Sequence, residues 1–339
     1  MDIKTFCNKL PKIELHAHLN GSLSESTLKK LYELANLPMD AFGLIFQPNP
    51  NRNLQEWFFM FDLVYKATNS PLAMTIATKE VIEDFAKDNV IYLELRTTPR
   101  SIPNKMTKKE YLDAIITGVN EAVSLYPIIV KLIISINRSK KDEDEIFDLA
   151  MEYHKKYPNL IVGIDIGGNP ISSDWKPELL KKAREYGFRI VIHTAEVPRE
   201  TETMEILKFK PDRIGHGTCI HPRLDGSDTT WKLLCESQIP VECCLTSNVC
   251  CQVYDGYANS HLKELIADNL PFTLGTDDKG IFLTNLSEEY EHAAETFNLN
   301  KTKLWKISNN SVDYSFATEK EKDDLHRILR KWKEENLFD

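Results

Sequence analysis

Histidine and carboxylate side chains recur in this sequence at the ends of short apolar runs. The first pair is His16 and His18, in the run at residues 13–19. Residues i and i+2 of a strand point to the same side, so both imidazoles can face one cavity. Two imidazoles at this spacing make half of a zinc site. Taken alone, the pattern is equally typical of polar residues that end a strand.

Three further polar clusters end later apolar runs. They contain His193 with Glu196, His216 between two glycines, and the adjacent carboxylates Asp277 and Asp278. If the runs are parallel strands of one barrel, these side chains lie at its carboxyl-terminal mouth, where barrel enzymes carry their active sites. Histidines and an aspartate that converge there predict a divalent metal site. Zinc matches these ligands best, and iron, cobalt and manganese are alternatives.

A metal site of this kind favours hydrolytic chemistry. A divalent ion lowers the pKa of a bound water from about 15.7 to about 7, and a nearby base must then move the proton. Glu196 lies three residues beyond His193 and suits proton transfer better than ligation. His216 and one carboxylate of the Asp277–Asp278 pair suit water orientation, because two adjacent carboxylates do not readily bind one ion together.

The apolar runs that position these clusters alternate with amphipathic segments. The runs are rich in Val, Ile and Leu on both faces, as buried parallel strands are. They cover residues 13–19, 90–95, 128–136, 160–166, 189–193, 213–215, 241–245 and 271–274. Helical spacing occurs between them at residues 55–68, 71–87, 108–124, 142–157, 176–186, 201–209 and 229–238. This alternation predicts an α/β fold, a (β/α)8 TIM barrel. An open doubly wound sheet is the alternative, but no glycine-rich phosphate turn follows the first run.

The first crossover, at about residues 20–89, is far longer than one βα unit requires. Long insertions at the carboxyl end of a barrel strand usually build a lid or a pocket wall, so we expect a helical lid here. Residues after about 287 are expected to form helices outside the barrel. The chain, residues 1–339, is thus predicted to be a single metal-dependent barrel domain.

The composition of the chain limits the kinds of partner that it is expected to bind. The 339 residues include 42 Lys and Arg against 51 Asp and Glu, a formal net charge of −9. Without a basic run, such a surface repels nucleic-acid polymers and anionic membranes, so neither is expected as a partner. The longest apolar stretch, residues 127–136, is too short to cross a bilayer, and residues 1–7 do not resemble a secretory leader. The seven cysteines are expected to be reduced thiols of a cytosolic protein, with a structural role for the cluster Cys243, Cys244, Cys250 and Cys251.

The chemical motifs together resemble those of the adenosine/AMP deaminase family. The resemblance covers nearly the whole chain and rests on motifs in the family's order. These are His16-Ala-His18-Leu-Asn20-Gly21-Ser22, His193-Thr-Ala-Glu196, Arg213-Ile-Gly-His216-Gly and Thr276-Asp277-Asp278. It implies a zinc-dependent barrel that replaces the 6-amino group of a purine by hydroxyl. Matched by motif, one zinc ion per chain would be bound by His16, His18, His193 and Asp277.

The same resemblance implies the other catalytic roles. Glu196 would protonate the purine ring, His216 would orient the attacking water, and Asp278 would hold that water and contact the purine. Gly168 matches the glycine whose backbone meets the base. The Cys-rich signature of the zinc deaminases that act on polynucleotides is absent from the sequence.

The turn after the second apolar run bears on the substrate. It reads Thr97-Thr98-Pro99-Arg100, and an arginine at the barrel mouth offers a bidentate fork for a phosphate, with two threonine hydroxyls beside it. A surface arginine in a loop is the alternative interpretation. This turn resembles the branch of the family that acts on a nucleoside monophosphate, and it implies hydrolysis of N6-methyl-AMP to IMP and methylamine. A plain adenosine or AMP deaminase with the same zinc site is the alternative.

Two candidate substrate contacts depart from the family pattern. Asn137 stands where an acid would meet the ribose, and Tyr65 stands where the lid would carry a histidine. His18 and Asn20 are the other expected contacts of the substrate. The expected partner is a small purine nucleotide, and the protein is expected to be a monomer. Two remoter alternatives are a zinc-barrel hydrolase of cyclic amides and a non-catalytic metal-binding protein. The first usually carries a carbamylated lysine where the fourth run here ends, at residues 164–167, without a lysine.

Overall fold

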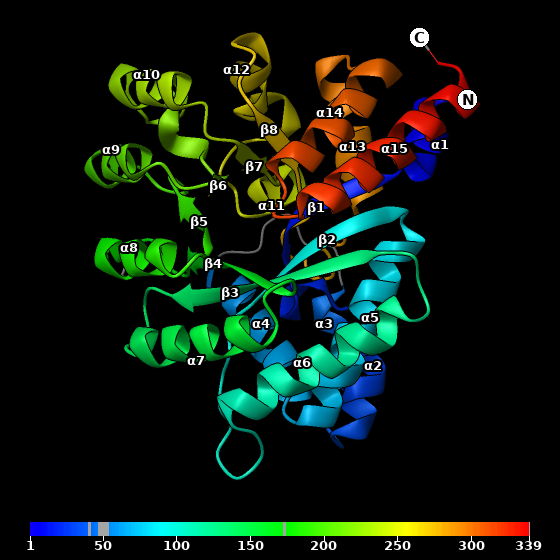
Figure 1. Cartoon of the computed structure of the whole chain (residues 1–339), viewed down its shortest axis with the longest axis vertical. Coiled ribbons are helices and arrows are strands. Elements are labelled where there is room, and N and C mark those ends of the chain that lie inside the picture. Colours follow the sequence, from blue (N-terminus) through cyan, green and yellow to red (C-terminus); the bar gives the residue numbers. More distant parts are fainter. Residues whose placement is uncertain (40–41, 47–53, 172–173, 339) are drawn as a thin grey trace.

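The centre of the molecule is a sheet of eight parallel strands that follow one another in space in chain order (Figure 1). The structure is a computed structural model and describes residues 1–39, 42–46, 54–171 and 174–338. The strands are β1 (Lys12–His18), β2 (Val90–Thr97), β3 (Ile129–Asn137), β4 (Ile161–Gly167), β5 (Arg189–Thr194), β6 (Arg213–His216), β7 (Val241–Cys243) and β8 (Phe272–Leu274).

The sheet closes at the seam between β8 and β1. Asp277, just beyond β8, forms a parallel bridge with Ala17 of β1. The amide of His18 donates to the carbonyl of Asp277 (2.9 Å), and the amide of Asp277 donates to the carbonyl of His16 (2.8 Å). This closure confirms the predicted (β/α)8 barrel, and it brings two of the chemical motifs side by side.

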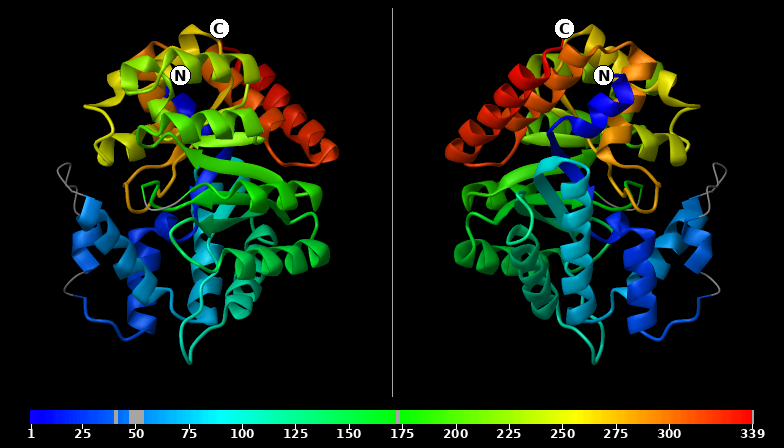
Figure 2. Two further views of the ribbon diagram at one scale, coloured as in Figure 1. Left: turned by 90° about the vertical axis from the view of Figure 1, so that its left-hand side faces the viewer. Right: turned by 90° about the vertical axis from the view of Figure 1, so that its right-hand side faces the viewer.

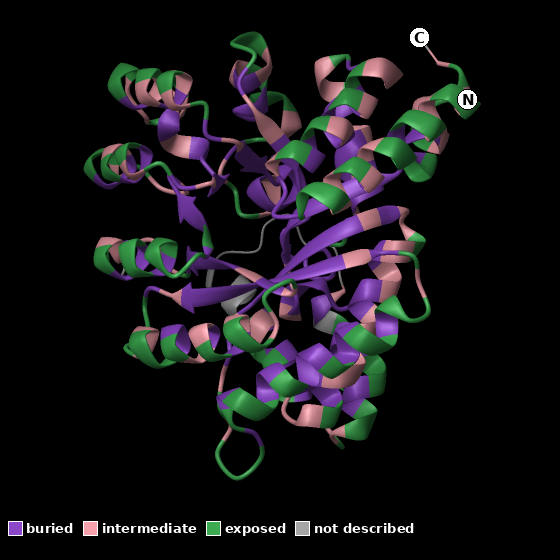
Figure 3. Cartoon of the chain, in the orientation of Figure 1, coloured by how far each residue is buried: buried purple, intermediate pink, exposed green. Residues whose placement is uncertain are grey.

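Helices in the crossovers cover the outside of the barrel, with buried faces inward and exposed faces outward (Figure 3). α6 (Lys108–Val123) shows why these segments are helical. Thr107 and Glu110 form a capping box at its start, and its buried face includes Tyr111 and Ile115. The other helical crossover elements are α7 (Glu143–Lys156), α8 (Pro177–Glu185), α9 (Glu200–Phe209), η2 (Thr218–Ile220), η3 (Pro222–Leu224), α10 (Asp228–Ser237), α11 (Leu245–Cys250), η4 (Tyr257–Asn259) and α12 (Leu262–Ala267).

The long first crossover forms a separate group of helices on one side of the barrel (Figure 2). Its elements are η1 (Asn20–Ser22), α2 (Glu25–Leu34), α3 (Phe42–Ile45), α4 (Leu54–Ala67) and α5 (Pro71–Lys87). The hydroxyl of Tyr32 on α2 donates to the carbonyl of Leu63 on α4 at 3.2 Å, which ties the group together. These helices occupy the part of the chain where the lid insertion is expected.

The terminal helices pack beside β1 and β8. They are α1 (Ile3–Lys9), α13 (Leu286–Phe297), α14 (Lys301–Tyr314) and α15 (Glu319–Asn336). Of these, α13 and α14 lie against the two strands, and α1 and α15 lie outside them. Phe316, in the link between α14 and α15, packs against Ile133 of β3 and Val191 of β5. The amide of Phe316 also donates to Glu94 of β2, so this link closes the bottom of the barrel.

Buried charges fill much of the barrel interior. We call this group the interior ion network; it consists of Glu94, Arg96, Asp165, Arg213 and Glu242, all fully buried. The Nε of Arg213 donates to Glu242 Oε1 at 2.6 Å, and the guanidinium also pairs with Glu94. Arg96 pairs with Glu242 and lies 3.5 Å from Asp165 Oδ1. Charges removed from water need this mutual compensation. The network connects the closed bottom of the barrel to the residues beneath its mouth.

The seventh strand differs from its prediction. An apolar run at residues 241–245 was expected to be extended, but β7 ends at Cys243 and α11 begins at Leu245. Beyond Cys243 the amide of Thr246 donates to Glu289 of α13 at 3.2 Å, a bond that lies outside the sheet ladder. In the described part of the chain, no helix combines the length and the apolar character that crossing a membrane requires.

Candidate metal and substrate site

His16 and His18 project from the end of β1 into the mouth of the barrel. The ring of His16 is fully buried, and two glycines make room for it. A Cβ added to Gly215 would lie 2.9 Å from His16 Cε1, and one added to Gly275 would lie 2.8 Å from His16 Cβ. Both distances are shorter than carbon atoms tolerate, so these glycines are what allow the imidazole to sit at this depth.

Carboxylates of the interior ion network fix the orientation of two histidines. Nδ1 of His16 lies 2.7 Å from Glu242 Oε2, and Nδ1 of His193 lies 2.9 Å from Asp165 Oδ1. A hydrogen bond at Nδ1 leaves Nε2 as the atom that faces the cavity, which is the arrangement usual for metal-binding histidines. Nε2 of His16 is buried and has no hydrogen-bond partner. A buried imidazole nitrogen left in this way fits a metal ligand.

Asp277 presents its two oxygens to different neighbours. Oδ1 lies 3.4 Å from Nε2 of His16 and 3.3 Å from Nε2 of His18. Oδ2 accepts a hydrogen bond from Ser247 at 2.7 Å and lies 3.8 Å from Nε2 of His216. Nitrogen and oxygen atoms at these separations surround a volume suited to one small cation.

Two overlapping sets of side chains could hold a metal. Nε2 of His18 lies 3.2 Å from Nε2 of His193, so the four residues predicted from the sequence do converge. A second set has His216 in place of His18. Its ligand atoms, from His16, His193, His216 and Asp277, all lie within 4.8 Å of one another. All five residues therefore belong to one cluster, which we call the histidine–aspartate cluster.

The two adjacent aspartates have electrostatic surroundings that shift their pKa values in opposite directions. Burial would raise the pKa of Asp277, but His16, whose Nε2 lies 3.4 Å away, and the neighbouring imidazoles hold it well below its usual range. Burial and the charge of Asp277 raise the pKa of Asp278 well above the ordinary value. The pKa values of the two adjacent carboxyl groups are thus driven in opposite directions. Pairs of acids with separated pKa values can divide charge stabilisation and proton transfer between them.

Asp278 lies over η1 with one oxygen unpaired. Its Oδ1 is buried and has no hydrogen-bond partner. A Cβ added to Gly21 would lie only 1.7 Å from this oxygen. The backbone of Gly21 also accepts hydrogen bonds from the amides of Gly280 and Ile281, at 2.9 and 3.1 Å. The glycine after Asn20 in the first motif is therefore the contact that lets Asp278 occupy this position.

Glu196 and His216 lie in turns that follow β5 and β6. Ala195 and His216 both have left-handed backbones, with φ of 53° and 61°, which redirect the chain at the mouth of the barrel. Burial lowers the pKa of His216, while the nearby carboxylates of Glu196 and Asp277 oppose this shift. Glu196 is half-buried. The predicted proton donor thus faces the cluster without being part of it.

The turn after β2 carries Arg100 into contact with the C-terminal end of α4. The guanidinium lies 4.6 Å above the ring of Tyr65, and its Nη2 donates to the hydroxyl of Thr68 at 2.6 Å. Nε and Nη1 of Arg100 are buried and have no hydrogen-bond partner. In the same turn Thr98 is half-buried and Pro99 is buried. Arg100 is therefore held through Nη2, while Nε and Nη1 remain as donors for an anion.

A hydrogen-bond chain joins Arg100 to other predicted substrate contacts. The hydroxyl of Thr68 donates to Asn20 Oδ1 at 3.1 Å, and Asn20 Nδ2 donates to the hydroxyl of Tyr111 at 3.0 Å. The hydroxyls of Tyr111 and Thr97 lie 2.8 Å apart. Sequence analysis missed Thr68 and Tyr111, because neither belongs to a motif and only the fold brings α4 and α6 to this turn.

Asn137 and Gly168 lie together at the ends of β3 and β4. Gly168 has a φ of 91°, a left-handed conformation that favours glycine. A Cβ there would lie 2.3 Å from Asn137 Oδ1, which accepts a hydrogen bond from the amide of Ser139 at 2.9 Å. The structure thus brings both predicted residues to one corner of the mouth.

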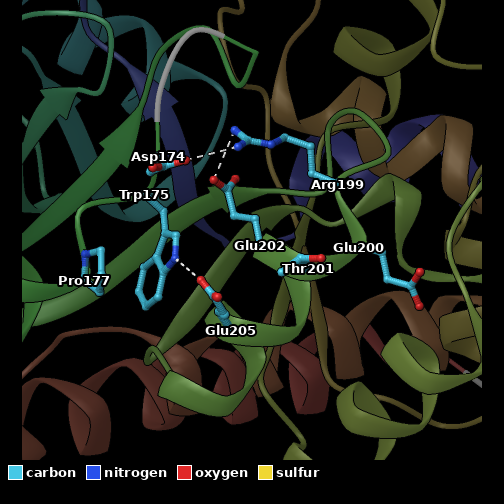
Figure 4. Close-up of a pocket in the computed structure, with 8 residues that line it drawn as sticks. All are labelled: Asp174, Trp175, Pro177, Arg199, Glu200, Thr201, Glu202 and Glu205. Atoms are coloured by element: carbon cyan, nitrogen blue, oxygen red, sulfur yellow. Dashed lines mark hydrogen bonds and ion pairs between the residues drawn. The ribbon is translucent and has the colours of Figure 1, made fainter.

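A different pocket, of about 480 Å³, lies between the loop before α8 and the start of α9 (Figure 4). It is lined by Asp174, Trp175, Pro177, Arg199, Glu200, Thr201, Glu202 and Glu205. Arg199 pairs with Asp174 at 3.3 Å and with Glu202 at 3.1 Å, and the indole of Trp175 donates to Glu205 at 3.1 Å. These ion pairs and hydrogen bonds join lining residues to one another, so they indicate a structural role, and the histidine–aspartate cluster lies outside this pocket.

Comparison with known proteins agrees with this geometry. The family model described as "Adenosine deaminase" matches residues 11–332. The N6-methyl-AMP deaminase of Bos taurus is 38% identical over 336 residues, which cover 97% of this chain and 95% of that protein. The crystal structure of Arabidopsis ADAL with GMP superimposes with a TM-score of 0.88 at 36% identity, over 96% of this chain and 98% of that chain. The ADAL–IMP complex gives a TM-score of 0.88 and 36% identity, over 98% of this chain and 99% of that one.

Proposed function

This chain belongs to the adenosine deaminase family, and from that premise we propose that it is a zinc-dependent hydrolase of N6-methyl-AMP. Water and N6-methyl-AMP would give IMP and methylamine. The observation that carries the proposal is the joint presence of the histidine–aspartate cluster and, beside it, Arg100 with two unpaired buried nitrogens. The relatives support the same assignment, since they include N6-methyl-AMP deaminases and nucleotide complexes with GMP and IMP.

For the metal we propose the ligand set His16, His18, His193 and Asp277, with zinc as the ion. The two faces of Asp277 support this choice over the set that contains His216. Oδ1 faces His16 and His18 at 3.4 and 3.3 Å, whereas His216 lies on the Oδ2 side at 3.8 Å. A zinc ion held there would supply the positive charge that makes water acidic near neutral pH.

The protein side chains would then divide the work of the reaction. His216 orients the attacking water, and Asp278 holds that water against the purine. As the water oxygen bonds to C6, His216 accepts one proton from the water and Glu196 delivers a proton to the purine ring. The proton held by His216 then passes to the exocyclic nitrogen, the bond from C6 to that nitrogen breaks, and methylamine leaves. The hydroxyl on C6 becomes the carbonyl of IMP, and its proton returns to Glu196. Gly168 offers its backbone to the base, next to Asn137.

Arg100 would bind the phosphate of the substrate. Tyr65 and Thr68 hold one side of the guanidinium, so little side-chain entropy is lost when a phosphate binds the other side. In the proposal, the phosphate position is surrounded by Thr97, Thr98, Pro99 and the side chain of Asn20. A phosphate bound there distinguishes a nucleoside monophosphate from a nucleoside, which has no anion at that end.

The proposed enzyme is a monomer with one zinc ion, and it acts in the cytosol. All proposed ligands and catalytic groups come from one chain, which supports the monomer. Thiols rather than disulfides suit a reducing compartment, and the structure gives this form for Cys7, Cys219, Cys235, Cys243, Cys244, Cys250 and Cys251.

Metal removal and product identification test this proposal. The purified protein is stripped with a chelator, and zinc is then returned in equimolar amount before incubation with N6-methyl-AMP. We expect IMP and methylamine in equal amounts from the zinc-loaded protein and neither from the stripped protein. Equal turnover without metal would contradict the zinc mechanism. Zinc binding without turnover of N6-methyl-AMP, AMP or adenosine would instead favour a cyclic-amide substrate or a non-catalytic metal-binding protein.

A further inference from the structure

A chain of buried hydrogen bonds runs away from the site behind His216. Nδ1 of His216 lies 3.1 Å from Oδ1 of Asn248, and Nδ2 of Asn248 donates to the hydroxyl of Tyr254 at 2.9 Å. The hydroxyl of Tyr254 donates in turn to Ser260 at 3.2 Å. All four side chains are buried. Neither Asn248 nor Tyr254 has so far been given a part in the proposed reaction.

The backbone around Asn248 is held as firmly as its side chain. Asn248 lies in α11, where its amide donates to the carbonyl of Cys244 at 3.1 Å. Its own carbonyl accepts the amide of Val253 at 2.9 Å, in the turn that leads to Tyr254. The preceding residue, Ser247, donates to Asp277 Oδ2 at 2.7 Å. One turn of α11 therefore contacts both Asp277 and His216 from the side away from the substrate.

The amide group of Asn248 has two ends, and Tyr254 selects which end faces His216. Because the phenol hydroxyl gives its hydrogen to Ser260, it offers a lone pair to the Nδ2 end of Asn248. The carbonyl oxygen is then the end left for His216. An oxygen acceptor at Nδ1 requires a hydrogen on that nitrogen, and the neutral imidazole then carries its lone pair on Nε2.

His216 differs in this respect from two other histidines of the cluster. Nδ1 of His16 and Nδ1 of His193 face the carboxylates of Glu242 and Asp165. His216 faces a neutral amide instead. The arrangement sets the position of the hydrogen on the ring without placing a charge behind it.

We propose that Asn248, anchored by Tyr254, is a positioning residue that holds His216 in the Nδ1–H tautomer with Nε2 turned toward the attacking water. The part about water rests on the proposed function. The part about the tautomer does not, since it is a property of the folded protein without substrate.

The test compares four variants of the full-length, zinc-loaded protein with the wild type. Asn248→Leu keeps the size of the side chain and removes the acceptor, while Asn248→Asp keeps an acceptor. Tyr254→Phe removes only the anchor. Thr246→Val is the matched control, because Thr246 lies on the same helix but its hydroxyl approaches Tyr257, 3.3 Å away. The readouts are the nitrogen-15 shifts of the His216 ring, zinc content, and kcat and KM for N6-methyl-AMP.

We expect the wild-type ring to show the Nδ1–H pattern. Asn248→Leu should shift His216 to a mixture of tautomers and lower kcat by about 10- to 100-fold, the usual effect of losing a partner one shell from a reacting group. KM and zinc content should stay within about twofold, since substrate and metal ligands are untouched. Asn248→Asp should restore the Nδ1–H pattern and part of kcat. Tyr254→Phe should act as Asn248→Leu does, but less strongly, and Thr246→Val should match the wild type.

An Nε2–H pattern in the wild type would overturn the proposal, as would an unchanged His216 spectrum in both Asn248→Leu and Tyr254→Phe. A loss of zinc, or a rise in KM with kcat intact, would also overturn the proposal. Either result would mean that Asn248 supports metal binding or substrate binding instead of the orientation of His216. If Asn248→Leu does not fold, Tyr254→Phe decides by the same criteria. A wild type with the Nδ1–H pattern but no turnover of any purine nucleotide would remove the proposed function and leave the tautomer assignment standing.

Discussion

In this site, the orientation of a single side chain is set by the residue that it contacts on the side away from the cavity. His16 and His193 owe their orientation to Glu242 and Asp165, at 2.7 and 2.9 Å. The convergence of the four predicted ligands was predictable because each lies in or just beyond an apolar run; they are His16, His18, His193 and Asp277. Their carboxylate partners were not, since Glu242 lies 226 residues from His16 and only barrel closure brings them together. Long-range pairing of this kind leaves no local pattern in a sequence.

Glu196 is predicted to be the proton donor, and its amide variant isolates that role. Glu196→Gln keeps the shape and should keep the zinc, but it cannot deliver a proton, so kcat should fall by at least about 100-fold. Steady-state kinetics with metal analysis checks this. Glu200→Gln, at an exposed neighbouring position, is the control and should behave as the wild type. Retained turnover in Glu196→Gln would mean that another group supplies the proton.

At the level of elements, the strands and most helices follow from the apolar periodicity. β7 and α11 do not, because the residues at 241–245 are all compatible with a strand. In the folded chain β7 ends at Cys243, and the amide of Thr246 donates to Glu289 of α13 at 3.2 Å. Ser247 and Asn248 therefore reach the site from a helix, which no pattern in the sequence indicated.

Gly21 in η1 leaves the space that the Asp278 carboxylate occupies, and this role can be tested. Gly21→Ala would place a Cβ 1.7 Å from Oδ1 of Asp278, so the carboxylate must move. We expect kcat to fall by at least about 10-fold with zinc retained, since a displaced reacting group commonly costs that much. Gly43→Ala is the control, because nothing lies within 4 Å of the added carbon there, and it should leave kcat unchanged. Unchanged turnover in Gly21→Ala would show that Asp278 need not lie over this glycine.

The buried Glu289 that links α13 to α11 makes the stability depend on pH. Burial raises its pKa from 4.5 to about 7, although hydrogen bonds from Thr246 and Thr284 oppose the shift. The folded state therefore holds a proton that the unfolded state has lost, and stability falls as pH rises from about 4.5 to about 7. Glu289→Gln removes this dependence. Its stability relative to the wild type should improve by up to about 3 kcal/mol between pH 4.5 and pH 8.

Urea unfolding at several pH values measures this difference directly, because every other titrating group is shared by the two proteins. The side-chain amide introduced by Glu289→Gln can still accept from the backbone amide of Thr246 and donate to the hydroxyl of Thr284, so the variant should fold. A stability difference that is constant from pH 4.5 to pH 8 would contradict the assignment of a protonated Glu289.

The whole molecule is tied together by the interior ion network, which reaches from the closed bottom of the barrel to its mouth. Arg213 bonds Glu242 at 2.6 Å and the carbonyl of Tyr314 at 2.7 Å, and its guanidinium stacks 3.8 Å above Phe316. We therefore predict that the chain unfolds as one domain. Arg213→Met removes the arginine that pairs with Glu94 and one of the two arginines that pair with Glu242, and it should cost about 3–5 kcal/mol of unfolding free energy.

Chemical denaturation followed by fluorescence and circular dichroism tests both parts of this prediction. The two signals should change together in a single transition. Arg189→Met is the control, since Arg189 forms an exposed pair with Asp212 at 3.0 Å, and its loss should cost less than about 1 kcal/mol. Two separate transitions, or equal effects of the two substitutions, would be inconsistent with a single barrel held by its interior charges.

The central claim is that the chain deaminates a nucleoside monophosphate, and one comparison of kcat/KM tests it most directly. Zinc-loaded wild type and Arg100→Ala are assayed on N6-methyl-AMP, AMP and adenosine. We predict the highest wild-type value on N6-methyl-AMP. Arg100→Ala should raise KM for both monophosphates by about 10- to 100-fold, since hydrogen bonds to a charged group are lost, and leave adenosine unchanged. A wild-type preference for adenosine, with the KM of the monophosphates unchanged in Arg100→Ala, would contradict the account.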